Sequence, residues 1–144
     1  MNLFVCIKQV PDTETKIKIL PDKSGIDPSG VKWIISSYDE FAIEEALRVK
    51  EKNADSTVTV FTAGPARAVE ALRTALAMGA DSAVHVDLPE SADNFTTAKA
   101  LAAAIQKEGA FQVLFCGKEA IDDGASQVAQ LLSAQLKLPL GAVV

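Results

Sequence analysis

The chain has 144 residues, a length that suits one domain. Of these residues 49% are hydrophobic and 23% charged, a composition typical of a soluble globular domain. Its net charge of −5 disfavours nucleic acid or an anionic membrane as the main partner, because both are negatively charged. No apolar run approaches the roughly 20 residues that span a bilayer, and the short run at Leu3–Ile7 lacks the basic lead of a signal peptide. We therefore expect no membrane insertion and a cytoplasmic protein, or a mitochondrial matrix protein if the source is eukaryotic.

The first third of the chain predicts a strand, a hairpin and a helix. Leu3–Ile7 is continuously apolar, as in a strand covered on both faces. Lys16–Leu20 alternates polar and apolar residues and predicts an exposed strand, on which Val31–Ile35 is expected to pair back as a small β-hairpin. The segment Ser37–Glu40 has the pattern of a capping box, which predicts a helix from there to about Lys52.

The rest of the chain alternates strands with helices. The predicted strands are Thr57–Thr62, Ala83–Val86 and Phe111–Cys116, and Gly141–Val144 resembles the opening of a fifth. The predicted helices are Ala66–Met78, stopped by Gly79, a second from Asp93 or Asn94 to Gly109, and a third over Ser126–Leu136. This alternation predicts a single domain over residues 1–144, an α/β fold with a parallel sheet and helices on both faces.

The candidate binding site follows from the sheet. Ligands of open parallel sheets bind beyond the carboxyl ends of the strands, at the point where the strand order reverses. If the order of the four main strands is 3-2-1-4, the crevice lies between the end of the first strand, at Cys6, and the end of the fourth, at Gly117. Gly117 would permit close approach of a ligand to the backbone.

The loop after the fourth strand leads into a helix through Gly124, Ala125, Ser126 and Gln127. The free amides of a helix start form an anion site, and small residues would let a phosphate come close. An ordinary turn at Gly124 with Ser126 as a helix cap explains the same residues equally well. Asp122 and Asp123 would face a ribose hydroxyl, a metal ion or solvent.

Other polar residues carry weaker signals. Lys8 follows a buried strand and is either solvated, paired with a carboxylate across the crevice, or facing the nucleotide. His85 lies within a strand, which favours a structural role, and Cys6 and Cys116 are expected to be buried reduced thiols. One histidine and two dispersed cysteines disfavour a zinc site, and the chain has neither a P-loop nor a G-x-G-x-x-G motif.

Several stretches resemble the electron transfer flavoprotein β subunit family. They are Val5–Thr13, Asp39–Arg48, Leu72–Asp81 (Leu-Arg-Thr-Ala-Leu-Ala-Met-Gly-Ala-Asp) and Cys116–Asp123 (Cys-Gly-Lys-Glu-Ala-Ile-Asp-Asp). Their order and spacing match the family over essentially the whole chain. The resemblance implies a five-stranded parallel sheet of the adenine nucleotide α-hydrolase type, which is Rossmann-like, with the carboxyl-terminal part of the family fold missing from this chain.

The resemblance also implies a role, cofactors and partners. A family member pairs with an α subunit that carries most of an FAD, receives electrons from flavin dehydrogenases such as acyl-CoA dehydrogenases, and passes them to a quinone reductase. Its β subunit holds AMP as a structural cofactor, or a second FAD in electron-bifurcating relatives, and has no catalytic side chains of its own. Carried over by position, the nucleotide would contact the following residues: Cys6, Ser36, Ser37, Tyr38, Asp39, Ala63, Gly117, Lys118, Glu119, Ala120, Ile121, Asp122, Asp123, Gly124, Ala125, Ser126, Gln127 and Val128.

Two departures from the family pattern leave the identity of the nucleotide open. The helix entry reads Ser36-Ser37-Tyr38 where the family has Asn-Pro followed by an aromatic residue, and Gly124–Gln127 replaces a more acidic segment. Two other functions remain as alternatives: a stand-alone ATP-binding or adenylyl-transferring enzyme of the same fold, and an interaction module with an empty crevice. The first would need phosphate-activating motifs that this sequence lacks.

Overall fold

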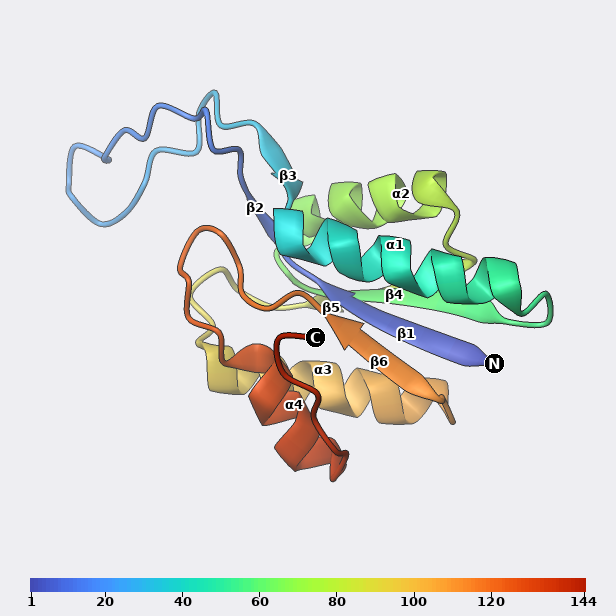
Figure 1. Ribbon diagram of the computed structural model, residues 1–144. Coiled ribbons are helices and arrows are strands. Elements are labelled where there is room, and N and C mark those ends of the chain that lie inside the picture. Colours follow the sequence, from blue (N-terminus) through green and yellow to red (C-terminus); the bar gives the residue numbers. More distant parts are fainter.

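The computed structural model describes residues 1–144 and contains a four-stranded parallel sheet (Figure 1). The strands are β1 (Asn2–Ile7), β4 (Thr57–Gly64), β5 (Ser82–Asp87) and β6 (Val113–Cys116), in the spatial order β5-β4-β1-β6. This order confirms the predicted 3-2-1-4 arrangement. The strands after β1 are added first on one side of it, as β4 and β5, and then on the other, as β6. The strand order therefore reverses between β1 and β6, where a crevice is expected.

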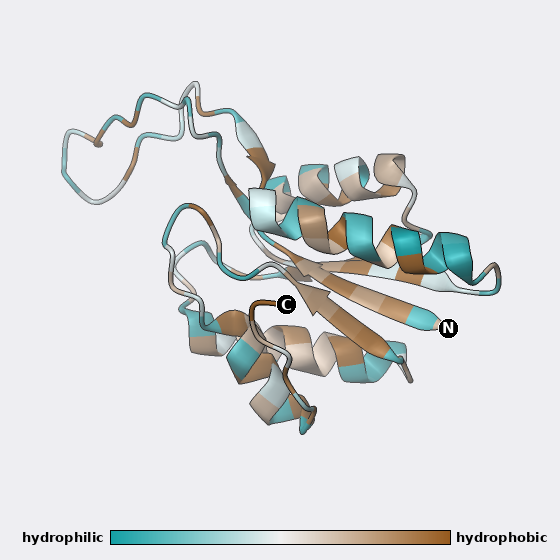
Figure 2. Ribbon diagram, viewed as in Figure 1, coloured by the Kyte–Doolittle hydropathy of each residue, from teal (hydrophilic) through white to brown (hydrophobic).

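Helices cover both faces of this sheet, as predicted. Figure 1 shows α1 (Ser37–Lys52) and α2 (Val69–Met78) on one side and α3 (Asn94–Glu108) and α4 (Val128–Leu136) on the other. A short 3-10 turn, η1 (Ala66–Ala68), leads into α2. In Figure 2 the strands are largely brown, whereas teal residues gather on the helices and loops, as the amphipathic patterns require.

The central strand β1 divides two apolar cores. Because successive side chains of a strand point to opposite faces, Leu3, Val5 and Ile7 pack under α1 and α2, while Phe4 and Cys6 pack under α3 and α4. All five are at most 6% exposed. The continuous apolar run thus has the predicted cause, burial on both faces.

The hairpin prediction was wrong in its pairing. The strand β3 (Trp33–Ile35) pairs antiparallel with β2 (Gln9–Pro11), directly after β1, and Lys16–Leu20 contributes only an isolated bridge between Ile19 and Ile26. Burial explains the difference, because Val10 and Ile35 enter the core, whereas Ile19 is 61% exposed and has no apolar face to cover. The residues between β2 and β3 form the long excursion at the upper left of Figure 1.

Three predicted boundaries also differ from the structure. The residue that caps α1 is Ser36, whereas the sequence predicted a capping box at Ser37. The Ser36 side chain makes no cap bond, and its hydroxyl accepts the N–H of Ile121 instead. The helix α4 begins at Val128 instead of Ser126, whose positive φ of 53° cannot belong to a right-handed helix. Residues 141–144 form no strand, and Val143 is 82% exposed, so this chain contributes four strands rather than the start of a fifth.

Other local signals are confirmed. The side chain of Asp93 caps α3 by accepting the N–H of Thr96 at 2.7 Å, and Gly79 ends α2 with a φ of 125°. No helix has both the length and the apolar composition required to cross a bilayer.

Candidate nucleotide site

A cavity of about 730 Å³ lies at the carboxyl ends of β1, β4 and β6. It is bounded by these strand ends, the β2–β3 excursion, the segment before α3 and the loop that enters α4. Its volume falls within the range of small-molecule and cofactor sites. The predicted crevice is therefore present, and at the predicted edge of the sheet.

Most of the predicted contact residues line this cavity. Those that do are Cys6, Asp39, Ala63, Gly117, Lys118, Glu119, Ala120, Asp122, Asp123, Ala125, Ser126, Gln127 and Val128. Ser36, Ser37, Tyr38, Ile121 and Gly124 do not line it. Ser36 instead lies fully buried behind the loop, where its hydroxyl accepts the N–H of Ile121 at 3.2 Å.

Asp39 fastens the two strand ends that form the floor of the cavity. Its carboxylate accepts the N–H of Lys8, just after β1, at 2.7 Å and the N–H of Gly117, just after β6, at 3.0 Å. The side chain is 7% exposed, and burial raises the pKa of this carboxyl to about 7 against the opposing effect of the two N–H donors. Two backbone segments far apart in the sequence are thus held by one side chain from α1.

The glycine at position 117 is required by protein rather than only by a ligand. A Cβ atom at this position would lie 2.9 Å from the backbone nitrogen of Asp39 and 2.9 Å from the carbonyl carbon of Tyr38. No side chain tolerates such contacts with backbone. The first turn of α1 therefore packs directly on the end of β6, and this packing explains why residue 117 has no side chain.

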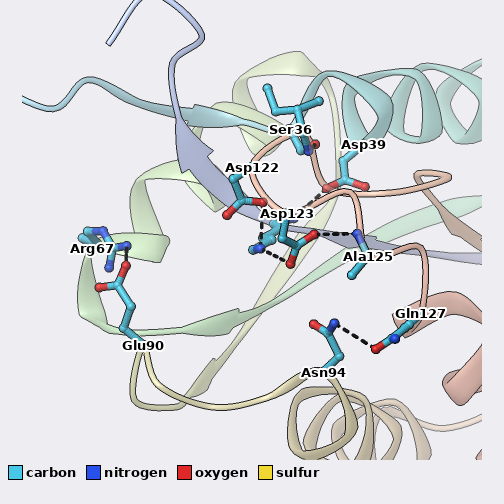
Figure 3. Close-up of polar contacts among 11 residues, drawn as sticks. Ser36, Asp39, Arg67, Glu90, Asn94, Asp122, Asp123, Ala125 and Gln127 are labelled. Carbon is cyan, nitrogen blue, oxygen red and sulfur yellow. Dashed lines mark hydrogen bonds and ion pairs between the residues drawn. The ribbon is translucent and has the colours of Figure 1, made fainter. Parts of the chain in front are cut away.

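Lys8 links the first strand to the loop before α4. Its Nζ lies 2.8 Å from Asp122 Oδ1 and 3.1 Å from Asp123 Oδ2 (Figure 3). Burial opposes the charge, but the two carboxylates outweigh it and raise the pKa of Lys8. Of the alternatives left open by the sequence, the paired lysine is the one observed, and its single charge offsets one of the two negative charges of the aspartates.

The entry into α4 is held by hydrogen bonds that leave its first amides free. The Ser126 hydroxyl donates to the carbonyl of Lys118 at 3.0 Å, and the Gln127 side chain accepts from Asn94 at 3.1 Å, a contact drawn in Figure 3. Neither side chain caps α4. The N–H groups of the first turn, beginning at Val128, therefore lack a side-chain acceptor and lie beside a cavity that Val128 and Ala129 line.

A second polar group on the cavity wall was missed by sequence reasoning. The guanidinium of Arg67 lies 3.7 Å from the ring centroid of Trp33 and pairs with Glu90 at 2.6 Å, as Figure 3 shows for the ion pair. Two buried side-chain atoms in this part of the wall, Oε1 of Gln9 and Nε of Arg67, have no hydrogen-bond partner. One sequence signal could have identified Arg67 as a wall residue. It follows Pro65, the first residue after β4, by two positions and so lies near the carboxyl end of that strand.

The remaining candidates are the histidine and the two cysteines. His85 Nε2 lies 2.8 Å from the carbonyl of Gly64, on the neighbouring strand, which fits the structural role predicted for it. No cluster of three or more histidine, cysteine or acidic side chains is arranged to hold a metal ion. Cys6 and Cys116 are both free, yet they are direct partners in the register of β1 and β6.

Comparison with known proteins gives a consistent result. Residues 24–144 match the family model of the electron transfer flavoprotein domain. The chain is 39% identical over 139 residues to the electron transfer flavoprotein subunit beta of Dictyostelium discoideum, covering 96% of this chain and 55% of that protein. It is 40% identical over 145 residues to the mouse protein of the same name, covering 98% of this chain and 56% of that one. The Syntrophomonas wolfei protein of this name is 42% identical over 139 residues, with 96% and 54% covered, so the chain spans about half the length of these relatives.

Proposed function

Because the chain belongs to the electron transfer flavoprotein family and resembles its beta subunits, we propose that its cavity holds AMP in a structural role. The observation that carries this proposal is the start of α4, whose uncapped first turn opens beside the cavity. Backbone N–H groups and the positive end of the helix dipole attract an anion at such a place. The small residues Ala125 and Ser126 leave room for a phosphate to approach.

Lys8 reduces the repulsion that acidic side chains near the cavity exert on an anionic ligand. Asp122 and Asp123 both pair with Lys8, whose single positive charge offsets one of their two negative charges. The raised pKa of Asp39, about 7, means that burial disfavours the charge on the third nearby carboxyl group. The free amides and the dipole of α4 are therefore the groups that would attract an anion here.

Two polar side chains of the cavity wall hold unpaired atoms. Gln9 Oε1 and Arg67 Nε are buried without a hydrogen-bond partner, which is costly, and a ligand would pair with them only if these side chains turned toward the cavity. A ligand bound only by the folded chain would also stabilise the fold, by about 2.7 kcal/mol at 100 times its dissociation constant. In this role the chain's residues bind and enclose the nucleotide and catalyse no reaction.

The wider role follows from the family and is part of the proposal. The complete protein would pair with an α subunit that holds FAD, the group that carries the electrons, and would accept them from flavin dehydrogenases and deliver them to a quinone reductase. Two relatives from rice are named as mitochondrial, which supports that compartment for a eukaryotic source, and we propose the cytoplasm otherwise. This chain would then contribute the nucleotide cavity and part of the surface that shapes the complex.

The test is to identify what the folded protein carries. Purified protein is denatured by heat, and the released small molecules are quantified by mass spectrometry. We expect AMP in near-equimolar amount, and a Gln127→Ala variant that retains less of it, because Gln127 immediately precedes the first turn of α4. Gln106→Ala, on the exposed part of α3, is the matched control. A well-folded protein that releases no nucleotide, and binds none added back, would refute the proposal.

The position of Arg67 supports one alternative ligand, FAD in place of AMP. The cavity of about 730 Å³ continues from α4 to Trp33, Arg67 and Glu90, so it brings a cationic side chain to the wall away from the start of α4. Arg67 could exchange its exposed partner Glu90 for a second phosphate. The same mass spectrum distinguishes the two ligands, and FAD release would replace AMP in the proposal while leaving the site unchanged.

A further inference from the structure

Cys6 and Cys116 are brought together by the parallel sheet although 110 residues separate them in the sequence. The register of β1 and β6 makes them direct Cα partners, and both side chains belong to the core on the α3 and α4 face. Neighbouring strands lie about 4.8 Å apart. This spacing falls within the Cα separations of about 4.4–6.8 Å that a disulfide can bridge.

The two thiols differ in accessibility. Cys6 is 6% exposed, whereas Cys116 is half-buried, and both line the floor of the cavity. Cys116, on the edge strand β6, is therefore the more accessible of the two thiols. The hydrogen bond with Cys116, together with burial, raises the pKa of the Cys6 thiol, which is consistent with direct contact between the two groups.

We propose that Cys6 and Cys116 form an oxidisable dithiol at the floor of the cavity, which a small disulfide compound such as oxidised glutathione converts to a protein disulfide. No other oxidant is required. This inference rests on the sheet register and on access through the cavity, so a nucleotide bound there would shield the dithiol, and the test is made on nucleotide-free chain.

The reaction proceeds by two thiol–disulfide exchanges. The thiolate of Cys116 attacks one sulfur of the small disulfide, which breaks its S–S bond, forms a mixed disulfide and releases one small thiol. Cys6 then loses its proton and attacks the Cys116 sulfur, which displaces the second small thiol. Two protein thiols are oxidised, one small disulfide is reduced to two thiols, and the two protein protons end on those thiols.

The accessibility of Cys116 sets the order of these steps, and the raised pKa of Cys6 sets their pH dependence. Cys116 reacts first because it is the exposed member of the pair. Closure by Cys6 becomes faster as the pH rises, because the raised pKa of Cys6 keeps it protonated at neutral pH and only the thiolate attacks. Bridging would tie the ends of β1 and β6 covalently where Asp39 already holds them by hydrogen bonds.

The test uses the full chain, reduced, freed of reductant and exposed to oxidised glutathione at pH 7 to 9. We expect a disulfide-linked pair of tryptic peptides, Met1–Lys8 with Glu108–Lys118, that disappears after treatment with dithiothreitol. Cys6→Ala should stop at a glutathione adduct on Cys116, and Cys116→Ala should stay unmodified. Circular dichroism of both variants establishes that they are folded.

Three results would overturn the inference. One is a folded wild-type chain that shows no linked peptide pair at any pH in this range. Another is a linked pair that arises between two molecules, seen as a dimer on a non-reducing gel. The third is folded Cys116→Ala that acquires glutathione on Cys6 as fast as the wild type acquires it on Cys116, because the assigned order of access would then be wrong.

Discussion

At the scale of single residues, the site depends on side chains that bind the protein's own backbone. Asp39 uses both carboxylate oxygens on the N–H groups of Lys8 and Gly117, and the Ser36 hydroxyl binds the N–H of Ile121. A buried N–H group without an acceptor is destabilising by about 1–3 kcal/mol, so these contacts fix the strand ends and the loop in place. The first turn of α1 thus positions residues that touch the cavity.

Asp39 predicts a pH dependence of stability. Its pKa in the folded chain, about 7, lies above the ordinary value of an aspartate, so folding favours its protonated form. The associated stability is fully present below the unfolded pKa and is lost as the pH rises through the folded pKa. Between pH 5 and 7 the free energy of unfolding should therefore fall with rising pH, by at most about 1.4 kcal/mol per pH unit.

The measurement is urea denaturation of the wild type and of Asp39→Asn across this pH range. Asparagine does not titrate, so the variant should lose the part of the pH dependence of the free energy of unfolding that Asp39 causes. This holds whether the variant is more or less stable than the wild type at any one pH. Asp87→Asn, at an exposed position, should keep the wild-type slope. An unchanged slope in folded Asp39→Asn would show that another group causes the dependence.

Gly117 predicts a large stability loss on a small substitution. In Gly117→Ala the new Cβ atom would press on the backbone of Tyr38 and Asp39, which cannot move without displacing α1. We expect the free energy of unfolding to fall by about 1–3 kcal/mol in chemical denaturation. Gly25→Ala is the matched control, because its Cβ atom meets nothing within 4 Å. Equal stability of the two variants would contradict the tight packing of α1 on β6.

At the scale of elements, the loop before α4 is held from three sides. The first strand reaches it through Lys8, α1 reaches it through Ser36, and the segment that starts α3 reaches its end through Asn94. The nine residues of α4 are too few for a stable isolated helix, so its position comes from these contacts and from packing of Leu132 in the core. The direction of its first turn toward the cavity is therefore a tertiary property.

Lys8 predicts how this loop affects the ligand. Lys8→Met removes both ion pairs and leaves two uncompensated carboxylates near the start of α4. We expect the dissociation constant for AMP, measured by calorimetry, to rise about tenfold, which corresponds to about 1.4 kcal/mol. Stability should change less, because partly exposed ion pairs contribute about 0–1 kcal/mol each.

The matched control is Lys32→Met, which removes a lysine–aspartate pair of the same 2.8 Å length, to Asp12, in the β2–β3 excursion. Lys32 does not line the cavity, so AMP affinity should stay at the wild-type value. If Lys8→Met binds AMP as tightly as Lys32→Met does, Lys8 does not govern the charge at the site.

At the scale of the whole molecule, the two faces of the sheet are tied together at one edge. The α1 and α2 face supplies Asp39 and Ser36, and the α3 and α4 face supplies Asn94 and the start of α4. The cavity lies where these contributions meet, at the ends of β1 and β6. A ligand there touches elements of both cores, so its binding energy would stabilise the sheet and both helical layers together.

The sequence by itself determined the order of the elements along the chain and the edge of the sheet at which the cavity lies, whereas the strand order was an assumption that the structure confirmed. Local patterns carry this information: apolar periodicity marks strands and helices, and signals such as Asp93 and Gly79 mark helix ends within a few residues. Whether AMP or FAD occupies the cavity stays a prediction. The choice depends on the distances between the loops that bound the cavity, which no local pattern of the sequence specifies.

The tertiary structure alone decided which residues meet. The pairing of β3 with β2, the ion pairs of Lys8, the contact of Gly117 with α1 and the alignment of Cys6 with Cys116 join positions about 20 to 115 residues apart. Such contacts leave no periodic or local signal, because each depends on how sheet and helices pack in space. The free energy of burial, rather than the propensity of any one segment, selects them.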